Sequence, residues 1–277
     1  MRLILFYNVA LQLAAESGKT AGEAFGMICR IGYTGIDPLV WGETGNDVKA
    51  LRALAKDHGL DIPACSCMAP LYSDADYDVC RKFVEAAADM GAKSAMLLPS
   101  PIPEGKERDD LRAILASYLS PLCLFARERG VTLSVENFSR LPCPFSTISD
   151  FEYLLTQVPE LMMTLDTGNF VWVGESPSEA ADRITALRRQ PFSHVHMKNY
   201  SRQMYNDNRS PAGRDLSGGI FYSYPCVGGG MADLGHICEK LKEIGYDGCV
   251  SVENGGIVPA EPALSDSASW LRENLGI

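Results

Sequence analysis

Short apolar runs alternate with amphipathic stretches along the whole chain. Eight runs have the length and composition of buried strands, at about residues 2–8, 34–40, 60–67, 93–99, 131–136, 161–166, 192–198 and 247–253. Between them, stretches such as 46–58, 107–129 and 232–244 have the periodicity of amphipathic helices. Strict alternation of strand and helix predicts parallel strands joined by right-handed crossovers.

A glycine repeatedly follows a predicted helix and precedes the next strand. These glycines are Gly32, Gly59, Gly91, Gly130 and Gly245. A glycine just past a helix accepts the left-handed backbone conformation that closes the last turn. Two copies are nearly the same phrase, IGYTG at 31–35 and IGYDG at 244–248. The recurrence indicates one αβ unit that is used many times.

Eight such units in 277 residues predict an α/β fold of the closed (β/α)8 type, a TIM barrel, as a single domain over 1–277. The alternative is an open doubly wound sheet, which usually has a glycine-rich phosphate loop after its first strand. Residues 7–10 read Tyr-Asn-Val-Ala and contain no glycine. The longest irregular stretch, 199–230, is rich in Gly, Ser, Asn and Tyr and is predicted to be a long active-site loop.

The N-terminal segment has two interpretations. Residues 1–15 (MRLILFYNVALQLAA) resemble a short signal peptide, with an early Arg and an apolar run. Asn8 and Gln12 interrupt that run, however, and cleavage near Ala15 would remove the first predicted strand. We therefore interpret the segment as the first strand of the barrel.

Composition and charge restrict the partners. The 25 Lys and Arg against 35 Asp and Glu give a net charge of −10, which argues against a nonspecific nucleic-acid binder and against an anionic membrane surface. No stretch approaches the roughly 20 apolar residues of a membrane span. The nine Cys are odd in number and form no CxxC pair, which indicates reduced thiols and a cytoplasmic location. A homo-oligomer is compatible with the sequence.

The last four predicted strands end in an acid or a histidine. Counting back by two residues from Glu136, Asp166, His196 and Glu253 gives small polar residues or a second histidine on the same strand face. The opposite faces are apolar, and in a barrel they contact the helices. The four polar ends therefore point toward one axis at the C-terminal ends of the strands, where barrel enzymes place their chemistry.

Three carboxylates would repel one another at such a point, and a divalent cation resolves this conflict. Oxygen ligands with one imidazole nitrogen suit Mn²⁺, with Mg²⁺ or Co²⁺ as alternatives. The sequence thus predicts one divalent metal bound by Glu136, Asp166, His196 and Glu253. Without a thiolate, the set is a poor structural zinc site.

The residues and their flanking phrases resemble the sugar phosphate isomerase/epimerase superfamily of xylose isomerase-like TIM barrels. The phrases are SVEN at 134–137, LDTGN at 165–169, HVHMKN at 194–199 and GYDGCVSVEN at 245–254. The resemblance covers nearly the whole chain and includes the ketose 3-epimerases. It implies that Glu136 and Glu253 also exchange protons with the substrate and that Arg202 contacts it, while Lys198 matches the HxK form of several relatives.

The chain also departs from the resemblance. Asn169 stands where the epimerases usually have a His, and Pro142 stands about where they carry a further Glu. Both positions should face the substrate, so Asn169 is an expected substrate contact while the identity of the sugar stays open. The endonuclease branch uses extra His ligands on early strands, and the third and fourth predicted strands here contain none. That absence and the net charge argue against DNA repair.

The resemblance implies metal-dependent proton abstraction next to a carbonyl, through an enediolate, on a small sugar or polyol. Return of the proton to the other face is epimerisation, and return to the adjacent carbon is aldose–ketose isomerisation. A dehydratase of a cyclic polyol or keto-acid and a noncatalytic sugar-binding barrel are the alternatives. Four further residues near predicted strand ends are candidates for the pocket lining: Tyr7, Asn8, Trp41 and Cys67.

Overall fold

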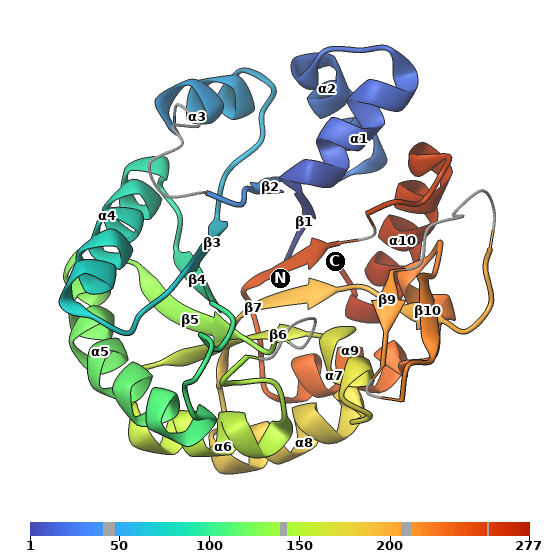
Figure 1. Cartoon of the computed structure of the whole chain (residues 1–277). Helices are drawn as coiled ribbons and strands as arrows, with labels where there is room; N and C mark the ends of the chain where they lie inside the picture. Colours follow the sequence, from blue (N-terminus) through green and yellow to red (C-terminus); the bar gives the residue numbers. More distant parts are fainter. Residues whose placement is uncertain (41–47, 139–142, 206–211, 216, 254) are drawn as a thin grey trace.

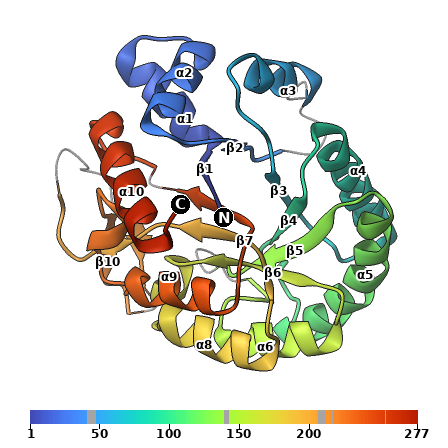
Figure 2. The ribbon, with the colours of Figure 1, turned by 180° about the vertical axis from the view of Figure 1, so that it is seen from behind.

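The computed structural model describes residues 1–277 except 41–47, 139–142, 206–211, 216 and 254 (Figure 1). Eight parallel strands form a ring, and helices surround it (Figures 1 and 2). The strands are β1 Arg2–Phe6, β2 Ile36–Asp37, β3 Ala64–Ala69, β4 Ser94–Pro99, β5 Thr132–Glu136, β6 Met162–Asp166, β7 Phe192–Met197 and β11 Cys249–Val252. The prediction of a TIM barrel is confirmed.

The strand order is β2-β1-β11-β7-β6-β5-β4-β3, and every neighbouring pair is parallel. Because β2 has only two residues, the ring closes toward β3 through the isolated bridges Gly35–Asp61 and Leu39–Ser66. The backbone N–H of Val40 also donates to the carbonyl of Ser66 at 2.6 Å. Because all neighbouring strands are parallel, their C-terminal ends lie at the same mouth of the barrel.

Helices connect the strands and cover the outside of the ring (Figure 1). They are α1 Tyr7–Ser17, α2 Ala21–Ile31, α3 Val48–Asp57, α4 Asp74–Met90, α5 Arg108–Glu128, α6 Ile148–Gln157, α7 Asn169–Trp172, α8 Pro177–Leu187, α9 Leu234–Glu243 and α10 Ala260–Leu275. The five glycines predicted to follow helices all have positive φ, between 68° and 106°. None of the helices in the described parts of the chain has the length and apolar composition needed to cross a bilayer.

The main core fills the layer between strands and helices. On β5, Leu133 and Val135 are buried in this layer, and burial of side chains of this size stabilises by about 1.5–3 kcal/mol each. The alternate residue Ser134 faces the barrel interior, where its hydroxyl lies 2.8 Å from that of Thr164 on β6. These two polar side chains thus hydrogen-bond to each other inside the barrel, whereas the apolar side chains of β5 pack toward the helices.

The segment after β7 differs from the expectation of an irregular loop over 199–230. Strands β8 Tyr200–Ser201, β9 Gly213–Arg214 and β10 Ile220–Ser223 form an antiparallel sheet in the order β8-β10-β9, and the short helix η1 Val227–Gly229 follows. Expecting irregular structure was wrong for these residues. Trp172, Tyr200 and Phe221 form a small apolar cluster, which gives the short strands a surface to pack on.

The first predicted strand ends two residues early. Strand β1 ends at Phe6, and Tyr7 and Asn8 form the first turn of α1. From there on the buried residues, Val9 and Leu13 among them, recur with helical spacing. The apolar run at the N-terminus therefore changes from strand to helix without a connecting loop.

Candidate metal centre

Four adjacent strands bring the four predicted ligands together. The order β11-β7-β6-β5 places Glu253, His196, Asp166 and Glu136 in a row, and one ligand atom of each lies within 4.8 Å of the others. Glu136, Asp166 and His196 are buried, whereas the side chain of Glu253 is 26% exposed. Solvent therefore reaches the cluster on the side of Glu253.

The imidazole of His196 lies at the middle of the cluster. Its Nδ1 is 2.6 Å from Oε1 of Glu136, 3.5 Å from Oε2 of Glu253 and 3.9 Å from Oδ2 of Asp166. The ring of Phe6 packs edge-on against the imidazole, with 5.5 Å between the ring centroids. One nitrogen atom thus faces three carboxylates.

The local structure directs one oxygen of Asp166 into the cluster. Its Oδ1 accepts hydrogen bonds from the backbone N–H groups of Gly168 and Asn169, both at 2.8 Å. The amide of Asn137 holds the backbone of Asp166 as well, because Nδ2 donates to its carbonyl at 3.0 Å and Oδ1 accepts from its N–H at 2.9 Å. Since β5 has already ended at Glu136, this side chain continues the β5–β6 ladder by one step. The remaining oxygen, Oδ2, is left to face His196.

The ammonium group of Lys198 lies among the same carboxylates. Its Nζ is 2.8 Å from Oδ2 of Asp166 and 3.1 Å from Oε2 of Glu253. The hydroxyl of Thr167 holds the Lys198 backbone, accepting from its N–H at 3.1 Å and donating to its carbonyl at 2.8 Å. The positive charge offsets part of the repulsion between the acids.

Burial perturbs the protonation of these groups. It raises the pKa of Glu136 to about 7, and the nearby charge of Asp166 contributes to the rise. Burial alone would lower the pKa of His196, but the carboxylates of Glu136 and Asp37 outweigh it and raise that pKa well above its ordinary value. Burial also raises the pKa of Asp166. Such shifts are common where ionisable groups converge at functional sites.

The donor set fits a divalent cation. Three carboxylate oxygens and one imidazole nitrogen converge from separate strands, and none of the four ligand atoms is a thiolate. Oxygen-rich sets with one imidazole are typical of hard or borderline divalent cations. The cluster of Glu136, Asp166, His196 and Glu253 is therefore a candidate metal centre.

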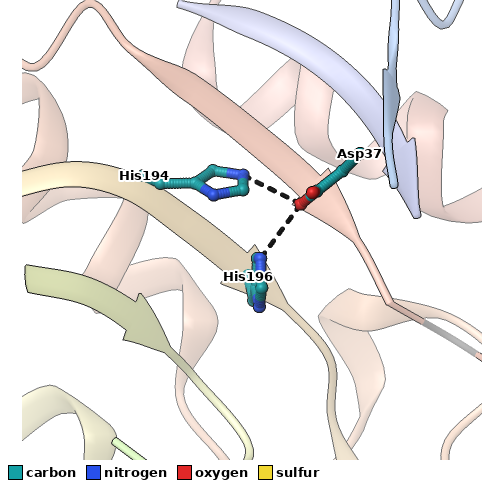
Figure 3. Close-up of side chains that lie close together, drawn as sticks. All are labelled: Asp37, His194 and His196. Atoms are coloured by element: carbon teal, nitrogen blue, oxygen red, sulfur yellow. Dashed lines mark hydrogen bonds and ion pairs between the residues drawn. The ribbon is translucent and has the colours of Figure 1, made fainter. Parts of the chain in front are cut away.

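The sequence reasoning missed Asp37, the last residue of β2. This fully buried side chain points at two histidines (Figure 3), with Oδ2 3.1 Å from Nε2 of His196 and 3.3 Å from Nε2 of His194. An acid inside the apolar run 34–40 was the available signal, because a carboxylate is rarely buried without partners.

Arg202 lies in the small antiparallel sheet. Its guanidinium forms an ion pair with Asp215 and lies over the ring of Phe221, 3.9 Å from the centroid. The side chain is 47% exposed. Its contact with a substrate stays a prediction.

The other predicted lining residues have varied surroundings. Tyr7 packs against the core from the first turn of α1, and Asn8 beside it is exposed. On β3 the hydroxyl of Ser66 faces the interior, 3.3 Å from Oδ1 of Asp37. Cys67 therefore points to the opposite face, where it belongs to the main core. Trp41 lies outside the described residues.

The fold and the cluster together define a TIM barrel with a candidate metal centre at the C-terminal mouth. A family model described as xylose isomerase-like TIM barrel matches residues 25–274. The chain belongs to this family, as the sequence phrases suggested.

Individual relatives include enzymes of two reaction types. The inosose dehydratase of Lacticaseibacillus casei is 26% identical over 174 residues, which are 61% of this chain and only 56% of that relative. A solved L-ribulose 3-epimerase is 16% identical, with a TM-score of 0.72 and coverage of 99% and 94% of the two chains. A xylose isomerase-like protein from Mycobacterium smegmatis, in complex with magnesium, is 19% identical with a TM-score of 0.68 and coverage of 92% and 87%. At these identities the solved structures establish the fold.

Proposed function

We propose that this protein is a divalent-metal-dependent epimerase or isomerase of a sugar or a related polyhydroxy carbonyl compound. Glu136, Asp166, His196 and Glu253 hold the cation, and the two glutamates exchange protons with the substrate. The observation that carries the proposal is the strand order, in which the glutamates stand at the two ends of the row of four. Two acid–base groups on either side of one site permit either reaction, because the proton can return to the opposite face of the same carbon or to the adjacent carbon.

The donor set supports Mn²⁺, with Mg²⁺ or Co²⁺ as alternatives. A cation bound there supplies Lewis-acid stabilisation of the negative charge that forms on the substrate oxygens when a carbon-bound proton leaves. The ammonium of Lys198, beside Asp166 and Glu253, is in position to donate a hydrogen bond to one of those oxygens.

The two glutamates have different surroundings. Burial raises the pKa of Glu136 to about 7 in the metal-free site, so a cation that binds there displaces a proton near neutral pH. The side chain of Glu253 is 26% exposed, while that of Glu136 is 4% exposed. We therefore expect solvent deuterium to enter the substrate mainly through Glu253.

A dehydratase is the second candidate, and the identity with inosose dehydratase favours it. Such a reaction begins with the same removal of a proton next to a carbonyl. It ends when a hydroxyl group leaves the neighbouring carbon as water, for which Lys198 is a nearby proton donor. At position 169 the chain has Asn where the epimerases usually have His, so it departs from the epimerases at an expected substrate contact.

Incubation in heavy water with Mn²⁺ and a panel of free ketoses, keto-acids and inositol-derived ketones tests both candidates. An epimerase or isomerase product keeps the substrate's mass apart from incorporated deuterium, whereas a dehydratase product is lighter by one water. Exchange should require the metal and stop on chelation. Metal-replete protein that gives neither exchange nor a mass change on any compound would contradict the proposal.

Two substitutions separate proton transfer from metal binding. Glu136→Gln and Glu253→Gln, each at saturating Mn²⁺ with bound metal measured, should lower kcat by about 10²-fold or more, the usual scale for general acid–base catalysis. Glu261→Gln, at the exposed start of α10, is the matched control and should leave kcat unchanged. A metal-replete Glu253→Gln protein with nearly normal turnover would leave Glu253 as a ligand only.

A further inference from the structure

A buried polar cluster lies beneath the candidate metal centre and has no role in the function proposed above. Asp37, His194 and Ser251 are all inaccessible to solvent. They come from β2, β7 and β11, and Ser66 of β3 joins them across the short closure of the ring. Figure 3 shows the carboxylate of Asp37 aimed at the rings of His194 and His196.

The donors and acceptors of this cluster can be assigned in order. A carboxylate only accepts, and Ser251 donates its hydroxyl proton to Oδ2 of Asp37 at 2.9 Å. The oxygen of Ser251 can then only accept from Nε2 of His194, which lies 2.9 Å away. His194 is therefore neutral with its proton on Nε2. Nδ1 of His194 is buried and has no hydrogen-bond partner among the described residues, as expected of the nitrogen that lacks a proton.

The same reasoning assigns His196. Its Nε2 lies 3.1 Å from Oδ2 of Asp37, so Nε2 must carry the proton that this carboxylate accepts. A ligating nitrogen must give up its proton, so a bound cation takes the place of the proton on Nδ1, the nitrogen that faces Glu136, Asp166 and Glu253. Nε2 keeps its proton because Asp37 accepts it.

By distance alone, Asp37, His194 and His196 could themselves hold a cation. The hydrogen-bond order argues against it, because both Nε2 atoms carry protons and a ligating nitrogen needs a free lone pair. His196 belongs to both groups and so connects Asp37 to the candidate metal centre.

We propose that Asp37 is a positioning residue that selects the metal-binding tautomer of His196 and fixes the direction of its ring. The inference rests on the proposed metal site and adds a residue that the sequence motifs did not contain. A carboxylate behind a ligating histidine orients the ring and makes it a stronger ligand, and loss of such a partner usually lowers metal affinity by about 10 to 100-fold. Ser66, Ser251 and His194 hold Asp37 in place.

The first experiment uses the unaltered protein. The chain has four histidines, so nitrogen-15 labelled imidazoles can be assigned by single substitutions. With Zn²⁺ as a diamagnetic probe, the His196 spectrum should show Nδ1 bound to metal and a proton retained on Nε2. A proton on Nδ1, or metal bound to Nε2, would overturn the inference.

The second experiment measures Mn²⁺ affinity by titration calorimetry. In Asp37→Asn the amide can donate to Nε2 and favour the wrong tautomer, so affinity should fall by about 10 to 100-fold. The matched control is Asp182→Asn, because Asp182 is also an acid that accepts a hydrogen bond from a histidine, Nε2 of His236 at 3.0 Å, but on the outer helices. The Mn²⁺ affinity of the Asp182→Asn protein should be unchanged. A folded Asp37→Asn protein that binds within twofold of the original overturns the inference.

The two proposals fail in different ways. If the unaltered protein binds no Mn²⁺, or if His196→Ala binds it normally, the proposed metal site itself is wrong. If the site is intact and only Asp37→Asn has no effect, Asp37 has no positioning role. A second bound cation that Asp37→Asn removes would also overturn the tautomer assignment.

Discussion

Removal of the Asn137 side chain should destabilise the barrel and also weaken metal binding at the candidate centre. Asn137 is fully buried, and its amide makes two hydrogen bonds to the backbone of Asp166, at 3.0 and 2.9 Å. Asn137→Ala leaves a buried N–H and a buried carbonyl without these partners, at about 1–3 kcal/mol each. For the two groups together we expect a loss of about 3 kcal/mol in the free energy of unfolding. This value is near the low end of the combined range because water can enter the space that the amide leaves. At about 2–4 °C per kcal/mol for a chain of this size class, the thermal midpoint should fall by about 6–12 °C.

The assay is a thermal melt followed by circular dichroism, with Mn²⁺ titration of the folded variant. Metal affinity should fall by about tenfold, because the carboxylate of Asp166 is no longer held in line with His196. The control is Asn274→Ala, which removes a single hydrogen bond to the carbonyl of Trp270 within α10 and should shift the midpoint by about 2 °C or less. A midpoint within about 2 °C of the original for Asn137→Ala would refute the reasoning, since two buried backbone groups cannot lose their partners at so small a cost.

Three further outcomes follow from the charges around the centre. Lys198→Met should tighten Mn²⁺ binding by about tenfold or more in calorimetry, because an ammonium beside two carboxylates repels a cation; weaker binding would contradict this account. Mn²⁺ affinity should rise with pH between about pH 5.5 and pH 8, because the raised pKa values of Glu136 and His196 mean that the cation must displace protons from both ligands; an affinity that does not change over this range would contradict their role as ligands. Arg202→Ala should raise KM for the true substrate, and unchanged kinetics would reduce Arg202 to its ion pair with Asp215.

The periodicity of the chain was sufficient to predict the barrel, because each unit contains its own local signals. A buried run, an amphipathic stretch and a helix-ending glycine recur, and Gly32 and Gly245 close their helices as expected. Element limits were less predictable where one apolar run serves two elements. Tyr7 could extend a strand or begin a helix, and packing against the core decided for the helix.

The sequence by itself determined the fold and the convergence of Glu136, Asp166, His196 and Glu253. Period-two alternation sets the face of each side chain, and parallel strands end at one mouth. Only the tertiary structure decided that Asp37 lies behind His196, because they are 159 residues apart and meet only when the ring closes. It also decided that Cys67 faces the helices, since the register of β3 with its neighbours determines which of two alternate residues points inward. Strand patterns are local, whereas register and ring closure depend on contacts between distant segments, and a sequence pattern does not contain those contacts.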